Sequence, residues 1–218
     1  MKKLGFAFCL LLSSPFCFVN GAPAVKQDVV QLLIPKLNSD RIAYFFGSYG
    51  VDPIQVNASP FGESRIANLY SLQGDQKIMR TLAIVDFKQP IPEDLKQAHQ
   101  CITQGQSIGI ALREKGWSIE KLPLYFGTVA LSPALKAWMH ESSCNSAAVH
   151  FYQLNVLKED RQPVPYCTII EVHSPQYLDA SWLQALYFGQ YQDHQEASGE
   201  AAALIGSLNL LITEFPYP

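Results

Sequence analysis

Residues 64–87 read SRIANLYSLQGDQKIMRTLAIVDF, two apolar-alternating segments joined by a short polar turn. Residues 147–172 repeat this pattern as AAVHFYQLNVLKEDRQPVPYCTIIEV. A Pro-led helix follows each copy, in KQPIPEDLKQAHQ and in HSPQYLDASWLQAL. Alternation with a period of two is typical of strands, and a polar turn between two such segments indicates an antiparallel hairpin. The sequence therefore predicts an α+β fold: an antiparallel sheet built from two strand–turn–strand–helix repeats, with flanking helices.

Helices are also expected before the first repeat and between the two. Apolar spacing predicts a helix over 25–37, which Pro35 should kink or end. Ser39 and Asp40 are good N-cap residues for a second helix over 41–49. The remaining elements are predicted as a helix from Pro92 to about Lys115, weakened at Gly105 and Gly109; a strand over 123–131; a short helix over 134–139 started by Ser132-Pro133; and closing helices near 178–188 and 197–213.

Residues 1–24 are typical of a secretory signal peptide. Lys2 and Lys3 form a positively charged start, residues 4–12 are apolar, and residues 22–24 offer a small-x-small cleavage site. The alternative is a membrane anchor, but the apolar run is much shorter than the ~20 residues that a spanning helix needs. We therefore expect a cleaved signal and a bacterial protein that is periplasmic or secreted.

The rest of the chain, 25–218, has the length of a single α+β domain, and no linker divides it. Of the 16 basic residues, 14 remain once Lys2 and Lys3 are removed, against 19 acidic ones. The resulting formal charge of about −5 and the lack of a basic run argue against a nucleic-acid partner. No other apolar stretch is long enough to predict a transmembrane segment in the mature protein.

Three cysteines remain after residue 24: Cys101, Cys144 and Cys167. An oxidising compartment favours one disulfide among them and leaves one thiol over, but the spacing does not assign the pair. Cys167 lies in an apolar strand, where a buried inert thiol is the commonest outcome.

Glu171 is the candidate catalytic residue, because it is a carboxylate among apolar neighbours in a central strand. A buried charge must be paired, hydrogen-bonded or functionally perturbed. The alternative is a glutamate at a strand end that reaches solvent before Pro175. Alternation places Glu171 on one strand face with Cys167, Ile169 and His173.

Arg80 and Arg65, both on the first hairpin, are the candidate ligand-binding residues. An arginine there can hold a ligand carboxylate through two parallel hydrogen bonds. Arg80 shares a predicted strand face with Leu82 and Ile84, and its alternative role is a surface ion pair with Asp86.

No motif in the chain predicts a cofactor or a metal ion. The sequence contains no phosphate-binding glycine loop, no GxGxxG and no GxSxG. The five histidines are scattered; His140 and Cys144, four residues apart, lack a convincing set of further ligands. Ser118 and Lys121 match a Ser-x-x-Lys spacing, but no Lys-Thr-Gly partner occurs, so we interpret the match as chance.

The hairpins resemble those of the chorismate-lyase fold, which is shared with the effector-binding domains of GntR-type transcription regulators. Four stretches carry the resemblance, over about half of the mature chain: SDRIAYF at 39–45, followed by Gly50; ESR at 63–65 with Leu69 to Leu72, Gly74 and Arg80-Thr81; LYFGTVALS at 124–132; and DRQPVPY at 160–166, followed by Glu171 and Pro175.

The resemblance implies a pocket that encloses a small aromatic or carboxylated ligand. In chorismate lyases a glutamate on the last strand and an arginine on the first hairpin serve the active site. By position Glu171 would be that glutamate, and Arg65 or Arg80 the arginine. The implied reaction is elimination of pyruvate by a carbon–oxygen lyase, with Glu171 as general acid/base.

Three functions therefore stay open. The first is a lyase, and the second is a ligand-binding protein without catalysis. The third is a non-enzymatic secreted interaction or virulence-type protein, which would use the aromatic residues near 187–191 to meet a partner.

Overall fold

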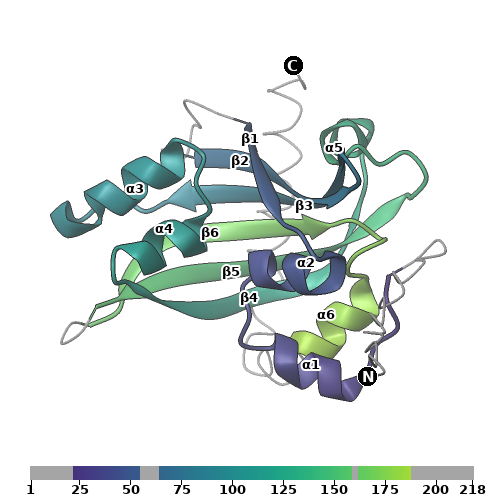
Figure 1. Cartoon of the computed structure of the whole chain (residues 1–218), viewed down its shortest axis with the longest axis horizontal. Helices are drawn as coiled ribbons and strands as arrows, with labels where there is room; N and C mark the ends of the chain where they lie inside the picture. The colour runs from purple at the N-terminus through teal and green to yellow at the C-terminus, as the bar shows by residue number, and fades with distance from the viewer. Residues whose placement is uncertain (1–21, 55–63, 159–161, 188–218) are drawn as a thin grey trace, which may run out of the picture.

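The computed structural model describes residues 22–54, 64–158 and 162–187 and has an α+β architecture (Figure 1). A six-stranded antiparallel sheet has the order β1-β2-β3-β6-β5-β4. The strands are β1 (Gly50–Ile54), β2 (Ser64–Gln73), β3 (Gln76–Phe87), β4 (Ser118–Ala130), β5 (Ser146–Leu157) and β6 (Val164–His173). The two predicted hairpins are β2–β3 and β5–β6, and they join where β3 pairs with β6. The predicted fold class is confirmed.

Six α-helices and one 3-10 helix are described. They are α1 (Gln27–Leu33), α2 (Asn38–Phe46), η1 (Glu93–Leu95), α3 (Lys96–Thr103), α4 (Ile108–Glu114), α5 (Pro133–Met139) and α6 (Ala180–Tyr187). The prediction of one helix from Pro92 to Lys115 is wrong, because the helix is interrupted between α3 and α4. Gly105 has a φ of +109° there, and a Cβ on it would lie 3.0 Å from the Pro53 ring. Only glycine is unstrained in that conformation.

Local signals set most of the other helix ends. The α1 helix stops at Leu33, two residues before Pro35, as predicted. The α2 helix begins at Asn38, so Ser39 and Asp40 lie in its first turn and are not the N-caps that the sequence suggested. The Oγ atom of Ser132 accepts a hydrogen bond from the Leu135 amide at 3.2 Å and caps α5 as expected. The predicted signal peptide up to residue 21 and the predicted helix at 197–213 lie outside the described residues.

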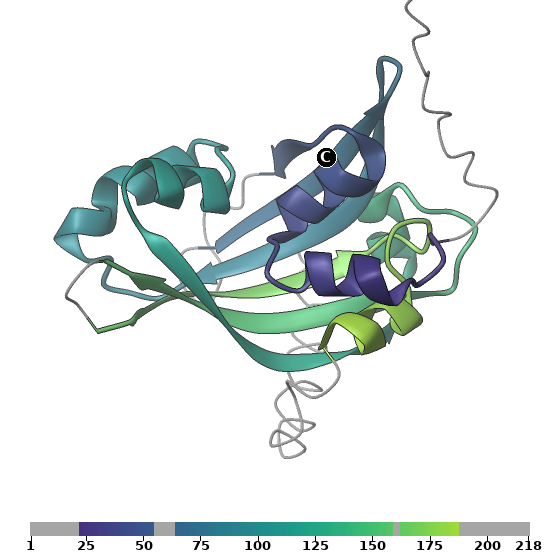
Figure 2. The ribbon, with the colours of Figure 1, turned by 60° about the horizontal axis from the view of Figure 1, so that its bottom comes forward.

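The sheet buries apolar side chains on both faces. Helices α1, α2, α3 and α4 lie on one face (Figure 2), and α6 packs into the same core as α1 and α2. Helix α5 covers part of the other face through Leu135, Trp138 and Met139. No helix within the described ranges is long and apolar enough to span a membrane.

Cys101, Cys144 and Cys167 are all free thiols, so the expected disulfide is not formed. Cys101 packs with the core under α3 and α4, whereas Cys144 packs with the core under α5 on the opposite face. Cys167 is fully buried, and burial raises its thiol pKa. Cys101 and Cys167 pack into the same core but form no disulfide, and Cys144 lies on the other face of the sheet. Cys167 is the inert core thiol that the sequence predicted.

Candidate functional site

Glu171 lies at the centre of the sheet, on the face that the larger group of helices covers. Its strand neighbours in register are Ala83 on β3 and His150 on β5, so these three side chains leave the same face. Glu171 is 4% exposed. The prediction that Glu171 is buried is therefore confirmed. The alternative, in which Glu171 reaches solvent at the strand end, is wrong.

Tyrosine and histidine side chains surround the Glu171 carboxylate. The Tyr152 hydroxyl donates to Oε1 at 3.1 Å. Oε2 lies 3.8 Å from Nδ1 of His150 and 4.0 Å from Nε2 of His173. Within the described ranges Oε2 accepts no hydrogen bond. One carboxylate oxygen thus remains available to a further donor or to a proton.

Burial and neighbouring charges set the ionisation of this cluster. Burial by itself raises the pKa of Glu171, but His150, Lys121 and His173 outweigh it and lower the pKa to about 2. For His150 and His173 burial dominates, and it lowers their pKa values to about 3 and about 4 despite the nearby carboxylate. At neutral pH the cluster therefore holds one carboxylate and two neutral imidazoles.

A buried chain of hydrogen bonds orients His173. The Asn38 amide donates from Nδ2 to Oγ1 of Thr81 at 3.1 Å, and that hydroxyl lies 3.0 Å from Nδ1 of His173. The Tyr177 hydroxyl donates to Oδ1 of Asn38 at 2.8 Å. Because Oγ1 of Thr81 accepts a hydrogen bond from Asn38, its hydroxyl donates to Nδ1 of His173. The imidazole then carries its proton on Nε2, which points toward Glu171. The chain ties α2 and the segment before α6 to the sheet.

Thr81→Val tests this chain. Valine has the shape of threonine but leaves Nδ2 of Asn38 and Nδ1 of His173 without their partner, so we expect a loss of about 1–3 kcal/mol in the free energy of unfolding. Thr128→Val, at an exposed position on β4, is the matched control and should change stability by less than ~0.5 kcal/mol. Urea unfolding followed by circular dichroism measures both, and equal effects would show that the Thr81 hydroxyl is not needed.

Arg41 of α2 connects three helices above the sheet. Its Nε donates to the Leu33 carbonyl at 3.0 Å and its Nη2 to the Ile34 carbonyl at 3.1 Å. These carbonyls end α1 and have no partner within that helix. Nη1 donates to the Tyr187 hydroxyl on α6. Arg41 is 1% exposed, so its charge is a buried part of the same assembly.

The structure brings Arg65 and Glu171 together in the lining of one cavity, which we call the Arg65 cavity. Its volume is about 60 Å³. Nη1 of Arg65 donates to the Ile102 carbonyl at 2.7 Å and to the Gln106 carbonyl at 2.8 Å. Nε has no hydrogen-bond partner among the described residues. Two backbone carbonyls thus hold the Arg65 guanidinium in place, while its Nε–H remains available to a ligand. Burial lowers the pKa of Arg65.

Arg80 lies apart from this cavity. A β-bulge at Leu69/Tyr70 leaves Arg80 without a partner on β2, and the strand alternation breaks there. Its guanidinium carbon lies 3.6 Å from the Phe46 ring centre on α2, and its Nε donates to Oγ of Ser71 at 2.9 Å. The predicted face shared with Leu82 and Ile84 is therefore wrong. So is the alternative ion pair, since Asp86 faces Lys88 at 3.8 Å.

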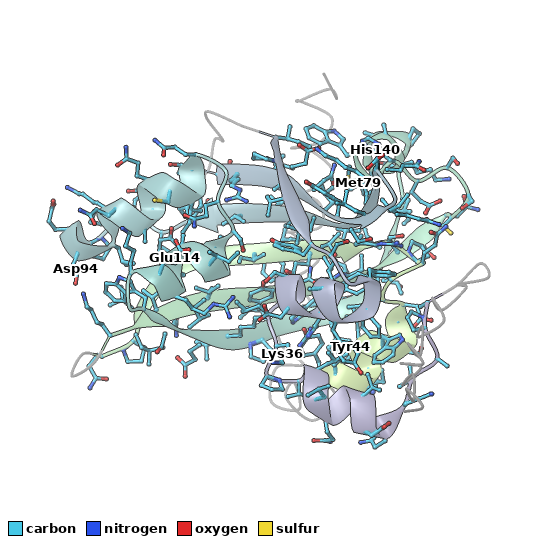
Figure 3. All side chains as sticks on the ribbon, in the orientation of Figure 1. Lys36, Tyr44, Met79, Asp94, Glu114 and His140 are labelled. Carbon is cyan, nitrogen blue, oxygen red and sulfur yellow. The ribbon has the colours of Figure 1, made fainter. Side chains whose placement is uncertain are left out.

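A second and larger cavity, the Lys121 cavity, adjoins the first. Its volume is about 210 Å³. Aliphatic side chains and the polar tips of lysine, histidine and tyrosine both line it, and Lys121 is the formally charged member among the described residues: Ile34, Pro35, Leu37, Ile119, Lys121, Pro123, His150, Tyr152 and Tyr187. The turn between α1 and α2 forms one wall, and Lys36, labelled in Figure 3, marks that turn. Leu37, Ile119 and Tyr152 line both cavities.

The Lys121 ammonium is buried although its stem is partly exposed. Nζ lies 4.8 Å from the centre of the Tyr152 ring and has no hydrogen-bond partner among the described residues. Burial lowers its pKa to about 8. The rings of His150 and Tyr187 stack beside it with centroids 3.9 Å apart. A cation, two phenols and an imidazole therefore converge on one face of β4 and β5.

Sequence reasoning missed Lys121, Arg41, His150 and Tyr152. One signal was present: alternation places His150 and Tyr152 on one face of β5, but only the β5–β6 register brings that face to Glu171. No group of three metal-ligating side chains occurs in the part of the chain that the structure describes. His140 ends α5 at the surface and does not join Cys144 in such a group.

Comparison with known proteins gives a faint likeness. No protein-family model matches the chain, and no curated protein matches it. Among solved structures it is similar to the C-terminal domain of YurK from Bacillus subtilis subsp. subtilis str. 168. The two are 15% identical with a TM-score of 0.31, over 60% of this chain and 89% of that one. A likeness of this size carries no conclusion about function.

Proposed function

We propose that this protein is a secreted or periplasmic protein of the chorismate-lyase-like fold that binds a small aromatic or carboxylated molecule. The observation that carries the proposal is the shared lining of the Arg65 cavity. An arginine from the first hairpin and a glutamate from the last strand meet there, as the sequence resemblance implied. Of the two arginines open at that stage, the geometry favours Arg65 over Arg80.

The size and lining of the two adjoining cavities also support a small ligand. A volume of about 60 Å³ holds a few waters, whereas about 210 Å³ exceeds the ~150 Å³ of an engineered apolar cavity that takes up benzene. Pockets for small molecules are mostly apolar, with a few convergent polar groups and ionisable residues of perturbed pKa. The Arg65 cavity beside Glu171 has this composition, and the Lys121 cavity adds a more polar surface with a lysine of lowered pKa.

The enzymatic form of the proposal is elimination of pyruvate from chorismate. The reaction is redox-neutral: the enolpyruvyl ether bond breaks, and pyruvate and 4-hydroxybenzoate form. Glu171, held as a carboxylate between Tyr152 and the two imidazoles, would move the proton. The Arg65 guanidinium would hold a substrate carboxylate.

Glu171→Gln tests the catalytic role. If the protein is a lyase, we expect the variant to remain folded and to lose turnover by about 10²–10⁴-fold, the usual contribution of a general acid/base. The assay incubates purified protein with chorismate and follows 4-hydroxybenzoate by absorbance. Glu93→Gln, at a surface position on η1, is the control and should keep full turnover.

Thermal-shift measurements in the same plate separate catalysis from binding. Stabilisation by small aromatic acids without product would mean a binding protein and would remove Glu171 from any lyase mechanism. Turnover that survives Glu171→Gln would also remove it. If no product forms and no aromatic acid stabilises the protein, the proposed function itself is contradicted.

A further inference from the structure

A buried lysine with no hydrogen-bond partner is unusual, and β4 supplies one. Lysine side chains near a surface normally extend their ammonium groups into water, and buried ones are normally paired. Lys121 does neither, because its Nζ lies on the Lys121 cavity and no described residue accepts a hydrogen bond from it. Its nearest aromatic contact is the Tyr152 ring, at 4.8 Å from Nζ to the centroid. Three hydrogen-bond donors therefore point at apolar and aromatic walls and at the cavity.

The charges around this ammonium do not balance. Arg41 and Lys121 are buried cations in this assembly, and Glu171 is its buried anion. Asp40, the next carboxylate, lies 3.6 Å from Nη2 of Arg113 and is partly exposed. With the two histidines neutral, Arg41, Lys121 and Glu171 together carry one positive charge in excess, and Arg65, buried in the adjoining cavity, adds another. A buried charge without a counter-ion is costly, so the site favours added negative charge.

The walls of the cavity define what can carry that charge. Ile34, Pro35 and Leu37 on the α1–α2 side oppose Ile119 and Pro123 on β4. They leave about 210 Å³, enough for a six-membered ring with one small substituent. The chemistry is that of a carboxylic acid with a small apolar body.

We propose that the Lys121 cavity is an anion subsite of this protein, and that Lys121 binds a carboxylate of a small aromatic acid whose ring lies on the aliphatic wall. This inference rests on the proposed function and deepens it. It gives the ligand a second cation besides Arg65, whose Nη1 already serves two backbone carbonyls. The Lys121 ammonium has no hydrogen-bond partner among the described residues. Glu171 then lies beyond Tyr152, on the side of the Arg65 cavity.

A matched pair of probes tests the subsite. Benzoate and benzamide have the same ring and nearly the same shape, but only benzoate carries a charge. Isothermal titration of the full chain at pH 7 should show benzoate binding at least tenfold more tightly than benzamide. In Lys121→Met, which keeps the length of the side chain, the benzoate affinity should fall at least tenfold and the preference should disappear. Lys121→Gln should behave in the same way.

Lys77→Met is the control, because Lys77 lies at an exposed position on β3, where its ammonium pairs with Asp52. It should bind both probes as the unchanged protein does. A preference for benzoate that persists in Lys121→Met, or equal affinities for both probes in the unchanged protein, would overturn the subsite and leave the proposed function standing. If neither probe binds and no other aromatic acid binds, both the subsite and the proposed function are contradicted.

Discussion

Replacing Arg41 with leucine is expected to lower the free energy of unfolding by roughly 2–4 kcal/mol, a large share of the stability of a domain this size. Leucine fills part of the space but donates no hydrogen bond. The carbonyls of Leu33 and Ile34 at the end of α1, and the Tyr187 hydroxyl on α6, then lose their charged donor. The Leu33 carbonyl keeps the Lys36 amide as a donor at 3.0 Å, so the larger losses fall on the Ile34 carbonyl and the Tyr187 hydroxyl. A buried polar group that loses its donor costs about 1–3 kcal/mol, and relief from burying the guanidinium offsets only part of that sum.

Chemical denaturation with circular dichroism measures this loss, and the control is Arg113→Leu. Arg113 on α4 is exposed, and its nearest carboxylate is Asp40 at 3.6 Å, so its removal should cost less than ~1 kcal/mol. A loss for Arg41→Leu no greater than that of the control would mean that α1, α2 and α6 are held by apolar packing alone. Hydrogen exchange should locate the weakened region at the end of α1.

The parts of the fold that the sequence predicted correctly are those set by short-range patterns. The two hairpins follow from alternation with a period of two, and the face occupied by Glu171 and His173 follows from the same alternation. Pro35 and Ser132 act on their own backbone neighbours and needed no tertiary information. The burial of Glu171 was one of two readings, and packing of helices over β6 decided it.

The errors arise where distant segments determine the outcome. Arg80 was assigned to the wrong face because it is the unpaired residue of a bulge, which breaks the alternation along β3. A bulge depends on the pairing of both strands. The break at Gly105 depends on a φ of +109° beside Pro53, which is far away in sequence. Lys121 was not predicted as a site residue, because its Ser-x-x-Lys match lacked partners and a lysine in a strand is ordinarily exposed. Its ammonium is enclosed by the α1–α2 turn and by His150, Tyr152 and Tyr187.

Lys121→Met is expected to stabilise the protein without ligand by up to about 3 kcal/mol at pH 7, while it removes anion binding. The pKa of Lys121 is lowered from 10.5 to about 8, and each pKa unit corresponds to about 1.4 kcal/mol. Below pH 8 the lysine is protonated in both the folded and the unfolded states, so the full cost of burying its charge opposes folding. Methionine fills a similar volume without that cost, as apolar replacements of buried charges often do.

The stability difference between the two proteins should therefore depend on pH in a defined window. Above about pH 8 the folded protein releases the Lys121 proton while the unfolded chain keeps its own until about 10.5, so the cost declines as pH rises. The charged and titratable groups around Lys121 are Arg41 and Asp40 from α2, His150 and Tyr152 from β5, Glu171 and His173 from β6, and Tyr187 from α6. They are present in both proteins, so their own titrations largely cancel in the difference.

Urea unfolding at intervals between pH 6 and pH 10.5 measures this difference directly. The advantage of Lys121→Met should be constant from pH 6 to about pH 8 and should shrink toward zero near pH 10.5. Lys77→Met, in which the altered ammonium is half exposed, should show no such change across the window. Saturating benzoate should reverse the order of stability at pH 7, because it stabilises only the protein that keeps its lysine. A variant less stable than the unchanged protein in the absence of ligand would mean that the ammonium already has a counter-ion, and the anion subsite would then have no electrostatic basis.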